Sequence, residues 1–123
     1  MTLLARLALV ALSLASAPAA AADPALDWAR AFYGGGPFCG TARVTAVGRD
    51  GDDIAVTLEI DPRWSESLAG LAPARRGRWF ALHCPYVTDA IWAMPGAGDV
   101  VVTGRAEFLG PFRFACRRHV FAP

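Results

Sequence analysis

The sequence predicts a small, mainly β domain in which five strands close into a Greek-key barrel. One helix precedes the strands, and a short helix lies between the third and the fourth. Apolar residues recur at every second position in several short segments, which is typical of half-buried strands. Turn-forming pairs that contain Gly or Pro separate these segments. The order of three strands, a helix and two strands then indicates the barrel.

Residues 1–22 have the three parts of a secretory signal peptide. One cation, Arg6, precedes the apolar run 7–14, and small residues up to Ala22 precede Asp23 at the expected cleavage point. The apolar run is shorter than the roughly 20 residues that a membrane-spanning helix needs. We therefore expect a mature chain of 123 − 22 = 101 residues that is periplasmic or secreted and has no membrane span.

Residues 23–40 are predicted to form a helix followed by a flexible hinge. Pro24 directly after Asp23 is typical of a helix start, and apolar residues follow at helical spacing as far as Tyr33. The run Gly-Gly-Gly-Pro at 34–37 ends the helix. It lacks the Gly-Lys-Ser/Thr signature of a phosphate-binding loop, so we interpret it as a hinge.

The barrel is predicted to occupy 41–123, with its first two strands at 41–49 and 53–60. Asp50 and Gly51 form the hairpin turn between them. Aliphatic residues occupy every second position of the second strand, and polar or small residues occupy the others. This pattern places one face of the strand in the core.

The third strand is predicted at 78–84, where RWFALHC alternates and then stops at Pro85. The segment 88–94 begins with a capping Thr and ends before a Pro-Gly pair, so it is predicted to be the short helix. The last two strands are predicted at 99–108 and 112–120. This assignment completes the five strands.

This order of elements is that of the OB-fold, a five-stranded Greek-key barrel. The segment GDVVVTGRAEF, residues 98–108, resembles the fourth strand of many OB-folds, and the resemblance covers 41–120. As an exported single domain, the chain resembles the small periplasmic bacterial OB-fold (BOF-like) proteins. The resemblance implies a fold and a compartment and assigns no functional residue. The added N-terminal helix and the cysteines depart from the pattern of that family.

Three cysteines permit one disulfide and leave one thiol over. In an OB-type barrel the third and fifth strands are neighbours, and the alternation turns Cys84 and Cys116 inward on them. The barrel therefore implies a Cys84–Cys116 disulfide, which would stabilise the fold by about 3–4 kcal/mol in the chain-entropy model. A Cys39–Cys116 pairing stays open, and Cys39–Cys84 is the least expected.

No metal, cofactor or catalytic residue is predicted. His83 and His119 fall on the outward phase of the two strands that carry Cys84 and Cys116. If the cysteines are level, the histidines are about 13 Å apart along the strands, too far to share an ion. The motifs Gly-x-Ser-x-Gly and His-Glu-x-x-His do not occur, so the chain is not expected to be an enzyme.

The outer face of the second and third strands is the predicted binding face. Trp79 lies at its centre, with Arg43, Glu59 and His83 around it. A large aromatic side chain that points outward from a strand tends to mark a contact site. In the alternative interpretation, the N-terminal helix covers Trp79 and completes the core of a small domain.

These features predict an exported, non-catalytic accessory binding module that recognises a protein of the bacterial envelope or a small ligand. Single-stranded nucleic-acid binding is one alternative, and a thiol- or metal-binding periplasmic protein is another. Nucleic acid is not the expected partner, because the mature chain has no net positive charge. Arg6 leaves with the signal peptide, so 12 − 1 = 11 basic residues face 11 acidic ones.

Overall fold

The computed structural model describes residues 22–107 and 110–117. The elements in chain order are α1 (Pro24–Tyr33), β1 (Gly36–Phe38), β2 (Ala42–Asp50), β3 (Asp53–Ile60), α2 (Pro62–Ala69), α3 (Pro73–Ala81), the 3₁₀ helix η1 (Ala90–Ala93), β4 (Val100–Ala106) and β5 (Gly110–Ala115). In this part of the chain, no helix is long and apolar enough to cross a membrane. The apolar run of the predicted signal peptide and His119 lie outside the described residues.

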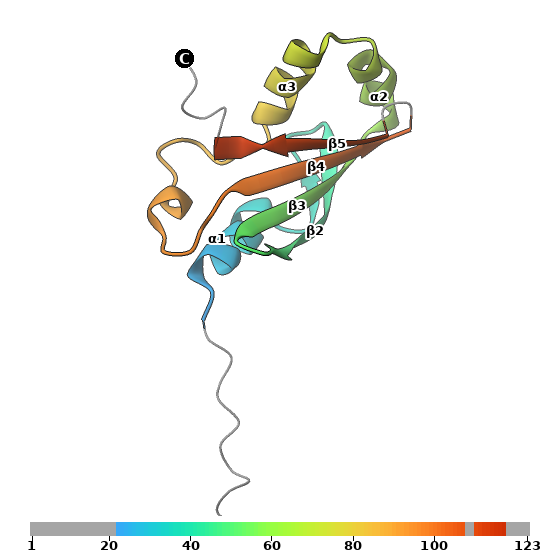
Figure 1. Cartoon of the computed structure of the whole chain (residues 1–123). Helices are drawn as coiled ribbons and strands as arrows, with labels where there is room; N and C mark the ends of the chain where they lie inside the picture. The colour runs from blue at the N-terminus through green and yellow to red at the C-terminus, as the bar shows by residue number, and fades with distance from the viewer. Residues whose placement is uncertain (1–21, 108–109, 118–123) are drawn as a thin grey trace, which may run out of the picture.

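The strands form one open sheet in the order β1-β2-β3-β4-β5 (Figure 1). Neighbouring strands are antiparallel except β3 and β4, which run parallel. A parallel pair needs a long crossover connection, and α2, α3 and η1 lie within it. The prediction of a β-rich, five-stranded fold is confirmed. The closed Greek-key barrel of the OB type is not, because the sheet is open and its strand order follows the chain.

The predicted N-terminal helix is confirmed as α1. The Asp23 carboxylate caps it by accepting a hydrogen bond from the Leu26 N–H at 3.2 Å, and the same carboxylate pairs with Arg49 of β2 at 2.8 Å. Ala25, Ala29 and Tyr33 form the buried face of the helix. The capped start and the buried stripe fix α1 against the sheet.

The predicted third strand at 78–84 is wrong, because α3 covers its first half and a turn covers the rest. Pro73 begins this helix, and the Ala- and Arg-rich segment after it favours helix. Phe80 is buried as expected, whereas Leu82 is 70% exposed, which the strand prediction did not allow. The missing strand is β1, in the segment that was predicted to be the hinge.

The core lies on the face of the sheet against which α1 and α3 pack. Phe80 of α3 is fully buried over Gly104 of β4, and its ring stacks on Phe112 of β5 at 4.6 Å. A Cβ atom at Gly104 would lie 2.3 Å from a carbon of the Phe80 ring. Gly104 pairs in regular register on both sides, and it makes room for the aromatic ring.

Candidate functional site

Exposed apolar side chains are concentrated in one short loop. The large apolar residues that are exposed in the described part of the chain are Trp64 at 41%, Leu82 at 70%, Tyr86 at 74% and Val87 at 51%. Three of these four lie within 82–87, which we call the apolar loop. Single exposed apolar residues are common on protein surfaces, but a cluster of them marks a contact site.

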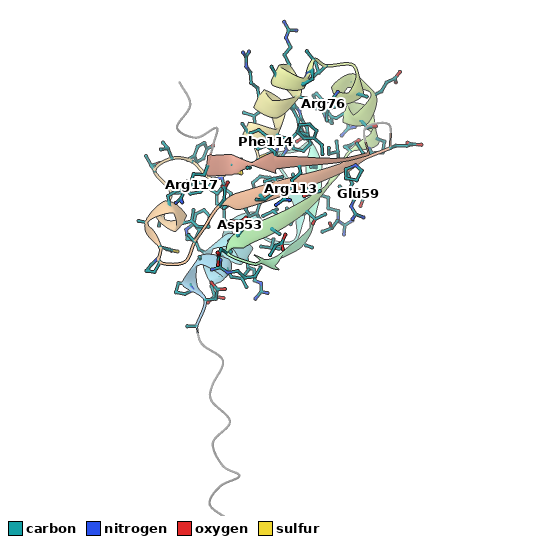
Figure 2. The ribbon with its side chains drawn as sticks, in the orientation of Figure 1. Asp53, Glu59, Arg76, Arg113, Phe114 and Arg117 are labelled. Carbon is teal, nitrogen blue, oxygen red and sulfur yellow. A yellow bond between two sulfur atoms is a disulfide. The ribbon has the colours of Figure 1, made fainter. Side chains whose placement is uncertain are left out.

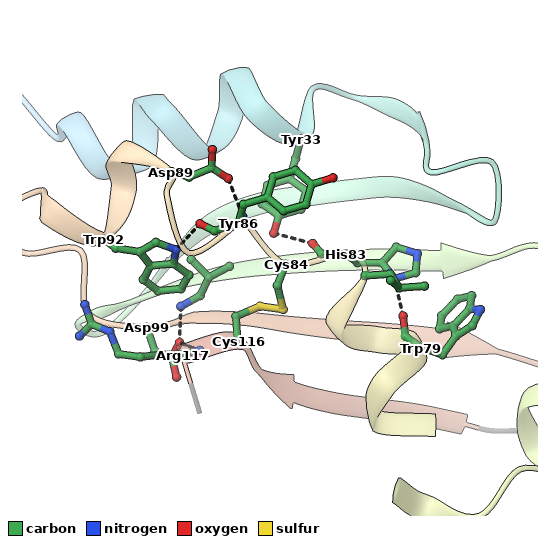
Figure 3. Close-up of a disulfide and its surroundings, with 12 residues drawn as sticks. Tyr33, Trp79, His83, Cys84, Tyr86, Asp89, Trp92, Asp99, Cys116 and Arg117 are labelled. Carbon is green, nitrogen blue, oxygen red and sulfur yellow. Dashed lines mark hydrogen bonds between the residues drawn. A yellow bond between two sulfur atoms is a disulfide. The ribbon is translucent and has the colours of Figure 1, made fainter. Parts of the chain in front are cut away.

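A disulfide fixes the centre of the apolar loop. Cys84 is bonded to Cys116, with a Cα–Cα distance of 5.6 Å, and both residues are buried (Figure 3). The predicted pair is confirmed, although the strand that suggested it does not exist. Cys84 lies in the turn after α3, and Cys116 directly follows β5. The bond ties the loop to the end of the sheet.

The buried side chain of His83 fixes the loop a second time. Its Nδ1 lies 3.2 Å from the carbonyl oxygen of Trp79, and its Nε2 lies 3.0 Å from the hydroxyl of Thr41. A carbonyl only accepts, so Nδ1 carries the proton and Nε2 accepts from the Thr41 hydroxyl. Burial lowers the pKa of His83, which keeps the ring neutral. In addition, the Tyr33 hydroxyl donates to the His83 carbonyl at 2.8 Å.

Hydrogen bonds also fix the far end of the loop at Tyr86. Its backbone N–H donates to the carboxylate of Asp89, and its carbonyl accepts from the indole N–H of Trp92 at 2.8 Å. The guanidinium of Arg117 lies over the Trp92 ring, 5.4 Å from its centre. The loop backbone is therefore held at three points while the side chains of Leu82, Tyr86 and Val87 remain in solvent. Such preorganisation lowers the entropy lost on binding.

The four residues of the predicted binding face do not lie together. Arg43 and Glu59 are exposed register partners on β2 and β3. Trp79 belongs to α3, is half-buried, and its ring contacts Phe80 and His83 at centroid distances of 5.1 and 4.5 Å. His83 was placed on the outward phase, which is wrong, because it is 1% exposed. The predicted binding face assumed a strand at 78–84, which the structure does not contain.

The remaining thiol is Cys39, which is exposed and lies beside the apolar loop. Its sulfur is 3.9 Å from the Leu82 carbonyl oxygen. Burial raises the pKa of this thiol, so the reactive thiolate is disfavoured at neutral pH. Within residues 22–107 and 110–117, no group of three or more His, Cys, Asp or Glu side chains could hold a metal ion. The site therefore presents contact area, with no activated nucleophile among its members.

Sequence reasoning missed Leu82, Tyr86 and Val87. A strand at 78–84 placed Leu82 in the core, and the two residues after Pro85 were treated as a connection. One signal was available, because apolar Tyr86 and Val87 follow a proline within a loop and belong to no periodic pattern. Apolar side chains in a connecting segment have no strand or helix face through which to be buried.

Comparison of the chain with protein-family models, curated proteins and solved structures finds no match.

Proposed function

We propose that this protein is an exported, non-catalytic binding module that docks on a protein of the bacterial envelope through the apolar loop. One observation carries the proposal: Leu82, Tyr86 and Val87 are each more than half exposed on a loop whose backbone is fixed. Burial of one such side chain in a partner is worth about 1.5–3 kcal/mol. Burial of all three would contribute favourable free energy to set against the cost of association.

A protein partner is favoured over a small ligand because of how these side chains are presented. They stand out from the surface, with exposed fractions of 70%, 74% and 51%. A ligand smaller than the loop would leave part of each side chain in water. The matching surface is a shallow apolar groove on another protein, with Tyr86 as the central anchor.

Site-specific photocrosslinking from position 87 in cells tests the docking. We expect a crosslinked partner at Val87 and none at Trp64, which is the exposed apolar residue on α2. Leu82→Ser and Tyr86→Ser together should abolish the crosslink and change the free energy of unfolding by less than about 0.5 kcal/mol each, as is usual for surface substitutions. Equal crosslinking from both positions would show that the loop is not special.

Export is tested separately. N-terminal sequencing of protein purified from the envelope fraction should begin near Asp23, where the signal peptide is expected to end. Mature protein that still begins at Met1 would contradict export and leave the docking result unaffected.

A further inference from the structure

The fold brings together two groups of arginines that are far apart in the sequence. Arg75, Arg76 and Arg78 belong to α3, and Arg113 belongs to β5, against which α3 packs. The segments 67–88 and 110–117 contain no Asp or Glu. Helix α3 and strand β5 therefore bring four basic and no acidic residues to their junction, in a chain whose total charge is close to neutral.

A cleft of about 760 Å³ lies between α3 and β5. Small residues of the helix, Pro73, Ala74 and Gly77, form one wall. Apolar side chains, among them Val101 and Ala115, form its floor. The volume is within the range of about 300–1,000 Å³ that is typical of ligand sites.

Arg78 of α3 and Arg113 of β5 supply the positive charge of this cleft. Both are exposed, and neither forms an ion pair with another described residue. Asp53 and Asp99 also line the cleft, and their carboxylates keep a negative charge while they accept backbone hydrogen bonds. Asp53 Oδ1 accepts from the Asp99 N–H at 3.0 Å, and Asp99 Oδ1 accepts from the N–H groups of Val100 and Arg117 at 2.8 Å.

Arg76 has a different, structural part in this arrangement. Its guanidinium donates to the carbonyl oxygens of Leu68 and Leu71 at 3.2 and 3.1 Å, and it lies over the ring of Phe112, 5.6 Å from its centre. Figure 2 shows Arg76 on the side of α2 and α3, whereas Arg113 projects from β5. Arg76 therefore holds the helix in place, and the guanidiniums of Arg78 and Arg113 remain available to a ligand.

We propose that this cleft is a second binding site, for a small organic anion with an apolar body. Its carboxylate or phosphate group would accept hydrogen bonds from Arg78 and Arg113, because guanidinium donors match the paired oxygens of these groups. Its apolar part would lie on the floor near Val101. A long polyanion is disfavoured, because Asp53 and Asp99 border the same cleft and the whole chain carries a net charge of only +1.

Titration of the full mature protein with decanoate and with phenyl phosphate tests this site. Backbone amide NMR shifts should saturate for at least one of the two probes and map to α3 and β5. Decanol, which lacks the charge, should bind at least tenfold more weakly than decanoate. Arg78→Gln and Arg113→Gln should each weaken binding about tenfold, which corresponds to about 1.4 kcal/mol.

Two further variants serve as controls. Arg43→Gln removes an exposed arginine outside the cleft, which faces Glu59 on β3, and should leave the affinity unchanged. Ala74→Phe fills the cleft from the exposed side of α3, and should abolish binding while the melting temperature stays within a few degrees.

Several results would overturn the proposal. One is the lack of saturable binding of either probe, and another is binding by the Arg78→Gln and Arg113→Gln variants that is as tight as binding by the parent protein. Inorganic phosphate that binds as tightly as both probes would show a charge effect without a ligand cleft. Tighter, salt-dependent binding of a single-stranded DNA oligonucleotide that requires both arginines would point to nucleic acid instead.

Discussion

The imidazole of His83 is buried between α3, the segment before β2 and the apolar loop, and both of its nitrogens are used. It lies within hydrogen-bond distance of the Trp79 carbonyl and the Thr41 hydroxyl, and 1% of its surface is exposed. In a protonated ring both nitrogens donate, so the Thr41 hydroxyl would have to change from donor to acceptor in a buried site. The contacts that hold the apolar loop therefore depend on the protonation state of His83.

Stability should fall as the pH drops below about 6.5. Burial lowers the pKa of folded His83 below its ordinary value of 6.5, so the unfolded state binds the proton more tightly. The contribution of His83 to the free energy of unfolding is complete above pH 6.5. It is lost progressively as the pH falls toward the lowered pKa. Urea unfolding at pH 7.5 and at pH 5 should show this loss of stability. The loss should be smaller in the His83→Gln variant.

Asp23 and Asp61, two carboxyl groups whose pKa values are lowered, titrate in a different pH window. The hydrogen bond from Arg49 lowers the pKa of Asp23 from 3.8 to about 2, so its contribution is lost only as the pH falls below about 4. The change between pH 7.5 and pH 5 can therefore be assigned by comparison with His83→Gln. Equal pH dependence in both proteins would contradict the role of His83.

At the scale of elements, the packing of α3 on the sheet depends on one glycine. Phe80 of α3 lies directly over Gly104 of β4, with Ile60 of β3 beside it. No side chain other than hydrogen fits between the strand and the ring. The helix approaches the sheet closely at this point, which places the start of the apolar loop.

Gly104→Ala should destabilise the protein by about 1–3 kcal/mol, the usual effect of overpacking a core. Its Cβ would lie 2.3 Å from the Phe80 ring and 3.0 Å from the Ile60 side chain. Gly48→Ala on β2 is the matched control, because a Cβ there has no neighbour within 4 Å. Urea unfolding of both variants tests this prediction. Equal changes in the free energy of unfolding would mean that the Phe80 ring moves aside at little cost.

At the scale of the whole molecule, the disulfide joins the crossover segment to the end of the sheet. Cys84 and Cys116 are separated by 32 positions, and the loop they close contains η1, β4 and β5. A small domain buries a modest fraction of its surface, so a covalent link adds stability that the core alone does not provide.

Replacement of both cysteines by alanine should lower the free energy of unfolding by about 3–4 kcal/mol, from the length of the closed loop. It should also weaken partner crosslinking, because the apolar loop loses its central anchor. Cys39→Ala is the control and should leave the stability unchanged, because Cys39 is exposed and unbonded. A double variant as stable as the parent would show that noncovalent packing alone holds the loop.

Local patterning specified those elements whose residues interact with near neighbours. The Asp23-Pro24 start of α1 and the alternation of β3 depend on contacts a few residues apart, and both were predicted correctly. The Cys84–Cys116 pair was also predicted correctly, although it was chosen from three possible pairings on the basis of a strand that the structure does not contain. The candidate binding face was not predicted correctly, because that prediction depended on the secondary structure of residues 78–84.

Packing between segments that are distant in the chain determined helix α3 and the order of the strands. Phe80 and Cys84 are four residues apart, so a strand and a helix place them on the same face equally well, and alternation over seven residues cannot distinguish the two. Helix α3 forms because Phe80 is buried over Gly104, a contact between segments that are distant in the chain. The open sheet likewise follows from the pairing of Ile54 with Val100 across 46 positions. Such pairings depend on which surfaces bury one another, and that is a property of the assembled chain.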